Sequence, residues 1–240
     1  MSTFQIVINN KYGANKRFLL LQAIPPPTNG PSGDIFTNVY QRSPIIQSGA
    51  SKVQFMMQQE YFAIIGTANK SDDGTHRVYT NEYLPTKLGP GGTIAAVTTQ
   101  DNNPMWDVNA AAGKTLAVKG GFAIVTDNTF TTDDPNPFYV GVGARDPSSS
   151  DSVIPLQTWV AEPGLNTQVY PKPKYYICTG EYQPGMVIDP SLLANVLTVD
   201  FTNAVVPQAQ FTLTNNGTYV PDSQVEVDGV KWSYGPMGGA

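Results

Sequence analysis

The sequence has little charge and no concentration of basic residues, and this excludes one large class of partner. Charged residues make up 14% of the 240 positions, against about 25% in an average soluble protein. The net charge is −5, and the 14 Lys and Arg residues are scattered along the chain. Binding of nucleic acid needs a cationic surface that neutralises phosphates. We therefore expect no nucleic-acid partner.

Metal-binding and thiol chemistry are limited by a single cysteine, Cys178, and a single histidine, His76. Two such residues cannot complete a tetrahedral zinc site. The glycine-rich stretch Gly89–Gly92 lacks the Lys-Ser or Lys-Thr that follows in phosphate-binding loops. We expect no metal and no cofactor.

Long hydrophobic runs are also missing, and nowhere do 18 apolar residues follow one another. The first residues, Met1–Asn10, do not show a basic stretch followed by an apolar one, as a signal peptide would. A lone cysteine cannot form an internal disulfide, which suits a reducing compartment. We expect no membrane span and a cytoplasmic location.

Glycine and proline, by contrast, are abundant, with 22 and 20 residues. The segments between them are rich in Val, Ile, Thr, Phe and Tyr, which favour strands over helices. Phe4–Asn10, for example, alternates apolar and other residues before a break at Lys11-Tyr-Gly-Ala. The pattern predicts an all-β chain forming an antiparallel β-sandwich, with helix only in short pieces. The main helix candidate is Asp189–Asn195, where an aspartate at the N-cap precedes a proline at the first helical position, and Trp106–Ala112 is the second.

Several segments of the first half resemble segments of the second half in the same order, which suggests an internal duplication. The interpretation is two tandem sandwich units, residues 1–118 and 119–240, joined near Gly113 to Gly121. Strand-rich sequences also resemble one another by chance, and the alternative is one large jelly-roll-like sandwich. The matched segments are Phe4–Asn10 with Phe122–Asn128, Arg17–Pro25 with Pro137–Arg145, Glu60–Gly66 with Lys174–Gly180, and Thr93–Asp101 with Gln210–Asn216.

Three acidic loops could offer oxygen ligands to calcium. They are Asp72-Asp73, Asp101–Asp107 and Asp133-Asp134. None has the Asp-x-Asp-x-Asp-Gly spacing of a calcium-binding loop, and aspartate is also a common turn former. The turn-forming role is the favoured interpretation.

Catalytic residues do not stand out either. His76 is the one residue that could act as a neutral-pH base, and no spacing selects a serine or Cys178 as its nucleophile. Cys178 lies in the apolar segment Tyr175–Thr179, where a thiol commonly acts as a small buried hydrophobe. We predict no catalytic residue.

Aromatic residues are the chemically interesting surplus, with 12 Tyr, 10 Phe and 3 Trp. Those beside Pro, Gly or Asn could lie at loops and offer a flat apolar face with a hydrogen-bonding tip. Packing in a sandwich core is the competing interpretation for each of them. The predicted ligand-binding residues are Tyr83, Trp106, Tyr170, Tyr182, Trp232 and Tyr234.

Low charge and exposed aromatic residues together favour a non-catalytic binding or interaction protein, lectin-like or self-assembling into a homo-oligomer. Its ligand would be a carbohydrate or a small apolar molecule. One alternative is a cofactor-free isomerase or cyclase that holds a small apolar substrate in an aromatic-lined pocket. The other is a structural subunit whose edge strands pair with further copies.

Overall fold

The computed structural model describes residues 3–70, 75–133, 136–189, 193 and 195–237. Nearly all regular elements are strands, and the helices α1 (Val108–Ala111) and α2 (Gln224–Val227) have four residues each. The all-β prediction and the short helix within Trp106–Ala112 are confirmed. Most of the other predicted helix, Asp189–Asn195, lies outside the described residues. No described helix is long and apolar enough to cross a membrane.

Most strands of the first half follow one another closely, but residues 23–34 separate β2 from β3. They are β1 (Thr3–Asn10), β2 (Lys16–Gln22), β3 (Ile35–Ile46), β4 (Lys52–Gln58), β5 (Tyr61–Lys70), β6 (His76–Pro85), β7 (Ile94–Gln100) and β8 (Asn103–Trp106).

The strands of the second half are separated by longer connections in places. They are β9 (Phe122–Thr126), β10 (Tyr139–Asp146), β11 (Ser149–Val160), β12 (Asn166–Val169), β13 (Lys174–Thr179), β14 (Val187–Ile188), β15 (Val196–Asp200), β16 (Gln208–Leu213), β17 (Tyr219–Pro221) and β18 (Lys231–Gly235).

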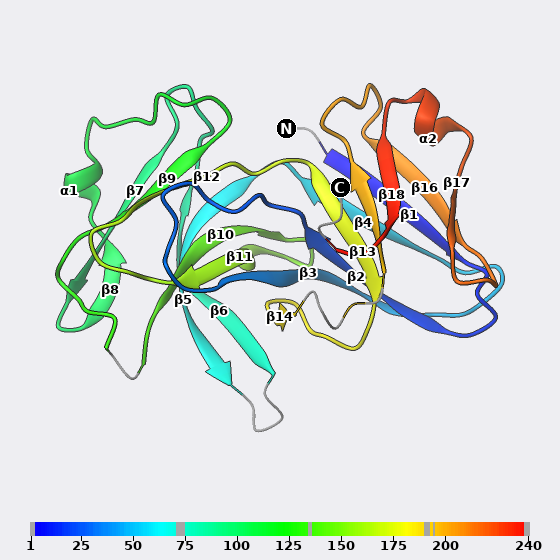
Figure 1. Ribbon diagram of the computed structural model, residues 1–240, viewed down its shortest axis with the longest axis horizontal. Coiled ribbons are helices and arrows are strands. Elements are labelled where there is room, and N and C mark those ends of the chain that lie inside the picture. The colour runs from blue at the N-terminus through cyan, green and yellow to red at the C-terminus, as the bar shows by residue number, and fades with distance from the viewer. Residues whose placement is uncertain (1–2, 71–74, 134–135, 190–192, 194, 238–240) are drawn as a thin grey trace.

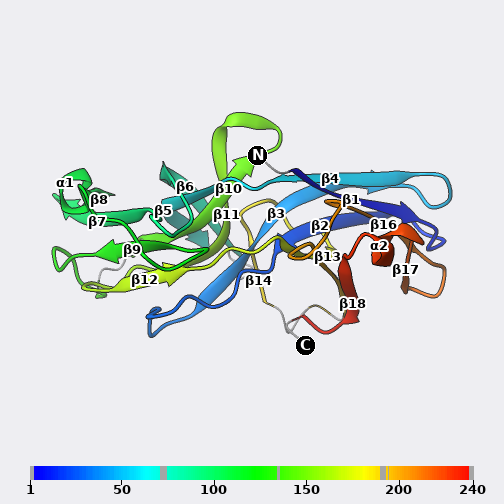
Figure 2. The ribbon, with the colours of Figure 1, turned by 90° about the horizontal axis from the view of Figure 1, so that it is seen from above.

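Three sheets are formed, and antiparallel pairs dominate (Figure 1). The long sheet has the order β18-β15-β13-β2-β3-β11-β10-β5-β6, with β14 paired to β3. Two four-stranded sheets have the orders β17-β16-β1-β4 and β12-β9-β7-β8. Each small sheet faces one end of the long sheet, so the molecule has two sandwich-like lobes side by side (Figures 1 and 2).

Each lobe takes strands from both halves of the chain. In one lobe, β1 pairs in parallel with β16, and β2 pairs with β13. In the other lobe, β9 pairs in parallel with β7, and β10 pairs with β5. The structure therefore does not confirm two tandem sandwiches, because neither half of the chain forms a lobe by itself.

The strand order is nonetheless symmetric about the middle of the long sheet. The central pair is β3 and β11. Counting outward from β3, the strands are β2, β13 and β15, and counting outward from β11 they are β10, β5 and β6, so that each strand of the first series corresponds to one of the second. The small sheets match in the same way, since β1 and β9 each have one parallel and one antiparallel neighbour. The matched segments of the sequence lie on these corresponding strands. That the two halves are copies of one unit stays a prediction.

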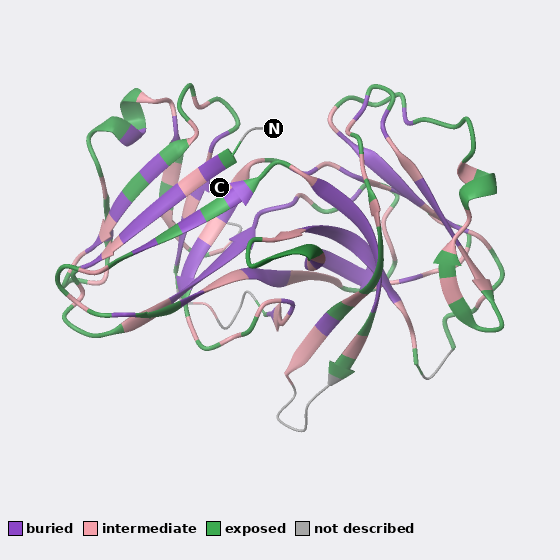
Figure 3. Cartoon of the chain, turned by 180° about the vertical axis from the view of Figure 1, so that it is seen from behind, coloured by how far each residue is buried: buried purple, intermediate pink, exposed green. Residues whose placement is uncertain are grey.

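One hydrophobic cluster runs through both lobes and across their junction. The alternation of side chains along each strand directs apolar residues into this cluster. In β4, for example, Val53, Phe55 and Met57 are buried while the residues between them are exposed. In the middle of the long sheet, β2 and β10 are mostly buried, and β3 and β11 are partly buried (Figure 3). The lobes therefore share a core rather than packing as separate bodies.

The junction of the lobes is the pairing of β3 with β11, which spans only the register pairs from Ile35 with Trp159 to Thr37 with Gln157. Buried polar side chains reinforce it. Thr158 Oγ1 donates to Asn38 Oδ1 at 3.0 Å, and Asn38 Nδ2 donates to the Gly185 carbonyl at 3.0 Å. Both side chains are fully buried, so each of these hydrogen bonds replaces one to water that the fold removes.

The Asn38 network predicts a large loss of stability on Asn38→Ala. The substitution leaves the buried Thr158 hydroxyl without its acceptor and removes one of the two hydrogen bonds to the Gly185 carbonyl, which still accepts from the Val78 N–H at 3.0 Å. We expect this to cost about 1 to 3 kcal/mol in the free energy of unfolding. Urea unfolding followed by tryptophan fluorescence measures it. The exposed control Thr202→Val stays within about 0.5 kcal/mol of wild type, and an equally small effect of Asn38→Ala would contradict the role of the network.

Candidate functional site

A polar cleft lies at the outer end of the lobe that contains β7 and β8. It has a volume of about 340 Å³. Its described lining, here named the Thr/Asn cleft, comes from β5, the β7–β8 hairpin, the connection from β9 to β10, and the end of β11. The lining residues are Thr67, Thr99, Asn102, Asn103, Pro104, Thr129, Phe130, Thr131, Thr132, Asn136, Pro137, Phe138, Val160 and Ala161.

A tight hairpin turn supplies one rim of the Thr/Asn cleft. Asp101 and Asn102 connect β7 to β8 with φ of +51° and +61°. Positive φ at both central residues is what a two-residue hairpin turn needs, and Asp and Asn tolerate it better than most residues. The turn places Asn102 and Asn103 in the lining.

Hydrogen bonds centred on Thr129 fix the opposite wall. Thr129 donates its hydroxyl to Asp127 Oδ1 at 2.6 Å, and its backbone N–H donates to the same oxygen at 3.0 Å. The Thr99 N–H donates to Thr129 Oγ1 at 2.9 Å, and the Thr99 hydroxyl donates to the Thr129 carbonyl at 3.0 Å. The loop after β9 is thereby tied to the end of β7.

The charge state of Asp127 follows from these contacts. Burial raises the pKa of the Asp127 carboxyl, but hydrogen bonds from Thr129 and Thr98 and from the backbone outweigh burial, and the pKa is lowered below its ordinary value. The carboxylate is therefore ionised at neutral pH and holds the Thr129 wall in place.

Two phenylalanines supply an apolar part of the cleft. Phe130 and Phe138 meet edge to face, with ring centroids 4.8 Å apart and planes at 62°. Both are half-buried and pack against the main hydrophobic cluster. This arrangement holds the rings rigidly while leaving part of their surface at the cleft.

None of the described lining residues of the Thr/Asn cleft carries a charge, whereas eight of them carry a hydroxyl or a side-chain amide. Such groups donate and accept hydrogen bonds without demanding a counter-charge. The arrangement suits a neutral ligand with many hydroxyl groups. A second hollow of about 420 Å³ shares Thr67, Asn136 and Pro137 with the cleft and continues to His76 and Tyr139.

Three of the predicted binding aromatics lie in or beside the lobe of the Thr/Asn cleft, but none is in its lining. Tyr83 on β6 packs edge to face on Phe62. Trp106 on β8 is half-buried against the core. Tyr170, which follows β12, donates its hydroxyl to Gln168 at 2.6 Å.

The other three predicted aromatics lie in the opposite lobe. Tyr182 packs against a small cluster under the connection from β13 to β14. Trp232 on β18 packs on Phe211, and its indole N–H donates to Glu226. Tyr234 packs on Tyr219 and lines a pocket of about 160 Å³. The structure does not gather the six residues into one site.

The Thr/Asn cleft could not be singled out in the sequence, because its residues come from four separate parts of the chain. The one local signal is the density of threonine in Thr129–Thr132 and at Thr98-Thr99. Runs of threonine are also common in ordinary strands, so that signal by itself does not indicate a ligand.

The acidic loop Asp101–Asp107 is engaged in local structure. Asp101 lies in the hairpin turn, and Asp107 caps α1 by accepting from the backbone N–H groups of Asn109 and Ala110. Asp72, Asp73 and Asp134 lie outside the described residues. Within the described part of the chain, no group of three or more His, Cys, Asp or Glu residues could hold a metal ion.

His76 is half-buried beside two aromatic rings, and Cys178 is buried. His76 packs edge to face against Phe36 and Tyr139, and its Nε2 lies 3.1 Å from the Tyr139 hydroxyl. Cys178 is buried, and burial raises the pKa of its thiol to about 12. At neutral pH this thiol is protonated and a poor nucleophile.

A model of the RhiA protein family matches residues 1–223 of the chain. The chain belongs to the RhiA family. The match covers strands of both lobes and the whole described lining of the Thr/Asn cleft. The family description names no activity. No curated protein and no solved structure is significantly similar to this RhiA-family chain.

The Asp127 network predicts an unusually acidic carboxyl. We expect its side-chain carbon, followed by NMR, to titrate below the reference value of about 3.9 for aspartate. Because the pKa of Asp127 is lower in the folded chain than in the unfolded chain, the ionised carboxylate stabilises the fold. This stabilisation is complete above the pKa of the unfolded chain and is lost as pH falls through the pKa of the folded chain. The amide signals of Thr129 and Thr99 should shift at the same midpoint, and a midpoint above 3.9 would contradict the network. Asp127→Asn should remove the transition.

Burial of Cys178 predicts slow alkylation. A free thiol with a pKa near 8.5 is a substantial fraction thiolate at pH 8, whereas a pKa of about 12 leaves almost none. We expect iodoacetamide to react at least about 100-fold more slowly with the native chain than with the chain in urea. Mass spectrometry of the alkylated peptide measures both rates, and equal rates would show that the thiol is accessible in the fold.

Proposed function

We propose that the chain is a non-catalytic binding protein that takes a carbohydrate in the Thr/Asn cleft. The observation that carries the proposal is the lining itself: eight hydroxyl or amide side chains surround an apolar surface, and none of the described lining residues is charged. A neutral sugar presents the matching combination of hydroxyl groups and apolar ring faces.

Preorganisation supports this function. The Asp127 and Thr99 hydrogen bonds hold Thr129, the hairpin turn holds Asn102, and the core holds Phe130. A wall that is already ordered loses little conformational entropy when a ligand binds. Loose surface threonines and asparagines would not offer that advantage.

The cofactor-free isomerase or cyclase alternative needs an aromatic-lined apolar pocket of ligand size. The Tyr-rich pocket of Tyr12, Tyr219 and Tyr234 has a volume of only about 160 Å³, below the roughly 300 Å³ at which small-molecule pockets begin. That pocket is therefore too small to hold the substrate of the alternative. Self-assembly, a structural role and a cytoplasmic location stay predictions.

Carbohydrate binding is tested with a glycan array followed by calorimetry on the strongest ligand. We expect Phe130→Ala to weaken binding about tenfold or more, because a ring face in contact with a sugar is lost. Asn102→Gly should weaken it less, by removing one amide while leaving a residue that tolerates the positive φ of the turn.

The control for both variants is Tyr83→Ala, which removes an exposed aromatic of the same lobe that does not line the cleft. Its affinity should match that of wild type. Binding lost in Tyr83→Ala but retained in both cleft variants would place the ligand elsewhere. An array with no bound glycan would contradict the proposal.

A further inference from the structure

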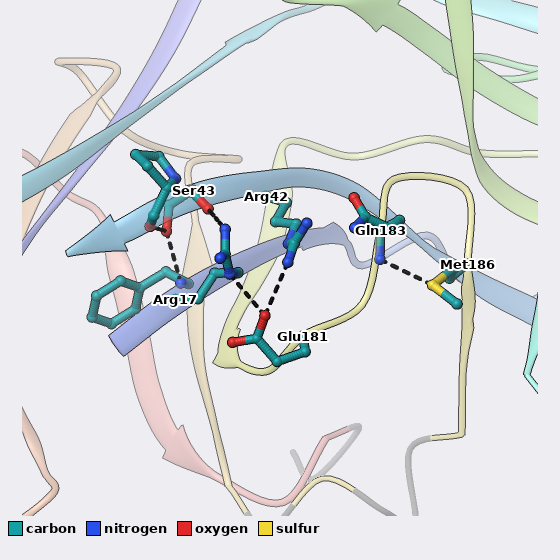
Figure 4. Close-up of polar contacts among 8 residues, drawn as sticks. Arg17, Arg42, Ser43, Glu181, Gln183 and Met186 are labelled. Carbon is teal, nitrogen blue, oxygen red and sulfur yellow. Dashed lines mark hydrogen bonds and ion pairs between the residues drawn. The ribbon is translucent and has the colours of Figure 1, made fainter. Parts of the chain in front are cut away.

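Two arginines from neighbouring strands converge on one carboxylate oxygen in the lobe opposite the Thr/Asn cleft (Figure 4). Arg17 lies on β2 and Arg42 on β3. The Nε of Arg17 and an Nη of Arg42 each lie 2.9 Å from the same Oε2 of Glu181. Two positive charges thus share one negative charge, and the cluster has a net charge of +1.

The three side chains differ sharply in exposure. The Arg17 and Arg42 side chains are 18% and 19% exposed, whereas that of Glu181 is 73% exposed. Arg17 is further fixed by donating from its Nη1 to the Ser43 carbonyl at 3.1 Å. The fold therefore holds the arginines in place, while Glu181 reaches them from solvent.

Glu181 leaves part of the arginines' hydrogen-bonding capacity unused. The contact of Arg17 Nε with Glu181 lacks hydrogen-bond geometry, and the Nε atoms of both Arg17 and Arg42 are buried without a hydrogen-bond partner among the described residues. The N–H donors of a guanidinium are best satisfied by an oxyanion that accepts two parallel hydrogen bonds from them. One oxygen of Glu181 does not do this for two arginines.

The backbone on either side of Glu181 is anchored. The Gly180 N–H donates to the Arg17 carbonyl at 3.2 Å. Gln183–Met186 closes a turn with Gly185 at φ +83°, and Gly185 N–H donates to the Val39 carbonyl on β3 at 2.8 Å. Glu181 can therefore leave the arginines by rotating its side chain, with no movement of the main chain.

The corresponding corner of the other lobe is open. Gly180 and Glu181 follow β13 as Gly66 and Thr67 follow the matching part of β5. In that lobe Thr67 lines both hollows of the Thr/Asn cleft region. The same position in the two lobes thus carries an uncharged opening in one and a covered cationic pair in the other.

We propose that Arg17 and Arg42 form a second ligand site, specific for an oxyanion such as a carboxylate or phosphate group, and that Glu181 is its built-in competitor. A ligand anion replaces the Glu181 carboxylate between the two guanidiniums. Release of Glu181 into water costs little, because its side chain is already mostly hydrated. This site does not rest on carbohydrate binding in the Thr/Asn cleft.

The experiment is an NMR titration of the full chain that follows the arginine Nε–Hε signals. Sodium phosphate and sodium acetate are added in separate series at constant ionic strength. We expect saturable shifts of the Arg17 and Arg42 signals, and in Glu181→Gln affinity about five- to tenfold tighter, because the competing ion pairs are gone. A response to phosphate alone identifies a phosphoryl ligand, and a response to acetate identifies a carboxylate. Arg42→Ala should abolish the saturable shift of Arg17.

Glu60→Gln is the matched control, because it removes a carboxylate from a separate ion pair, in which Glu60 lies 3.7 Å from Arg145. It should leave the anion affinity of Arg17 and Arg42 unchanged. Saturable binding in Glu181→Gln alone supports a site that Glu181 keeps closed. Absence of saturable shifts with both anions in Glu181→Gln, with the backbone amide spectrum preserved, would overturn the proposal and leave Glu181 as a clamp on its loop.

Discussion

The pairing of β3 with β11 is the interaction on which the rest of the molecule depends. It joins the strands of the two lobes into one long sheet, although its register covers only three residue pairs. Asn38 and Thr158 make the junction specific, because a buried amide and hydroxyl are satisfied only in one register. Gln157 adds a buried hydrogen bond from its Nε2 to the Ile24 carbonyl at 3.0 Å. A slip by one residue would turn all these groups to the wrong face.

This junction also explains why the lobes exchange strands. Once β3 and β11 lie side by side, the chain passes from one lobe into the other after β4 and returns after β12, so each lobe is completed by strands from the other half. Buried tyrosines reinforce the exchange. Gln22 on β2 pairs with Tyr175 in the sheet and donates to the Tyr61 hydroxyl at 2.8 Å. Burial raises the pKa of Tyr61 to about 12, which keeps its hydroxyl neutral and able to hydrogen-bond.

The two lobes have similar pairing and different surfaces. A strand framework tolerates changes at exposed positions, because those side chains contribute little to the core. Thr67 and Glu181 hold corresponding places after Gly66 and Gly180, and they give one corner a neutral opening and the other an ion cluster. One architecture can therefore offer two chemically distinct surfaces within a single chain.

The sequence by itself determined the all-β class, because β-branched and aromatic residues between frequent glycines and prolines specify strands locally. It also determined the short helix after Trp106 and the buried, unreactive surroundings of Cys178. Only the tertiary structure decided which strands meet. The partners of β1 are β4 and the distant β16, and pairing across such separations leaves no local pattern. The same holds for the sites. Thr99 and Thr129 meet because β7 pairs with β9 in a small sheet, and Arg17 meets Glu181 because β2 pairs with β13 in the long sheet. The aromatic residues that the composition made conspicuous are instead distributed over both lobes, where most of them pack against other side chains.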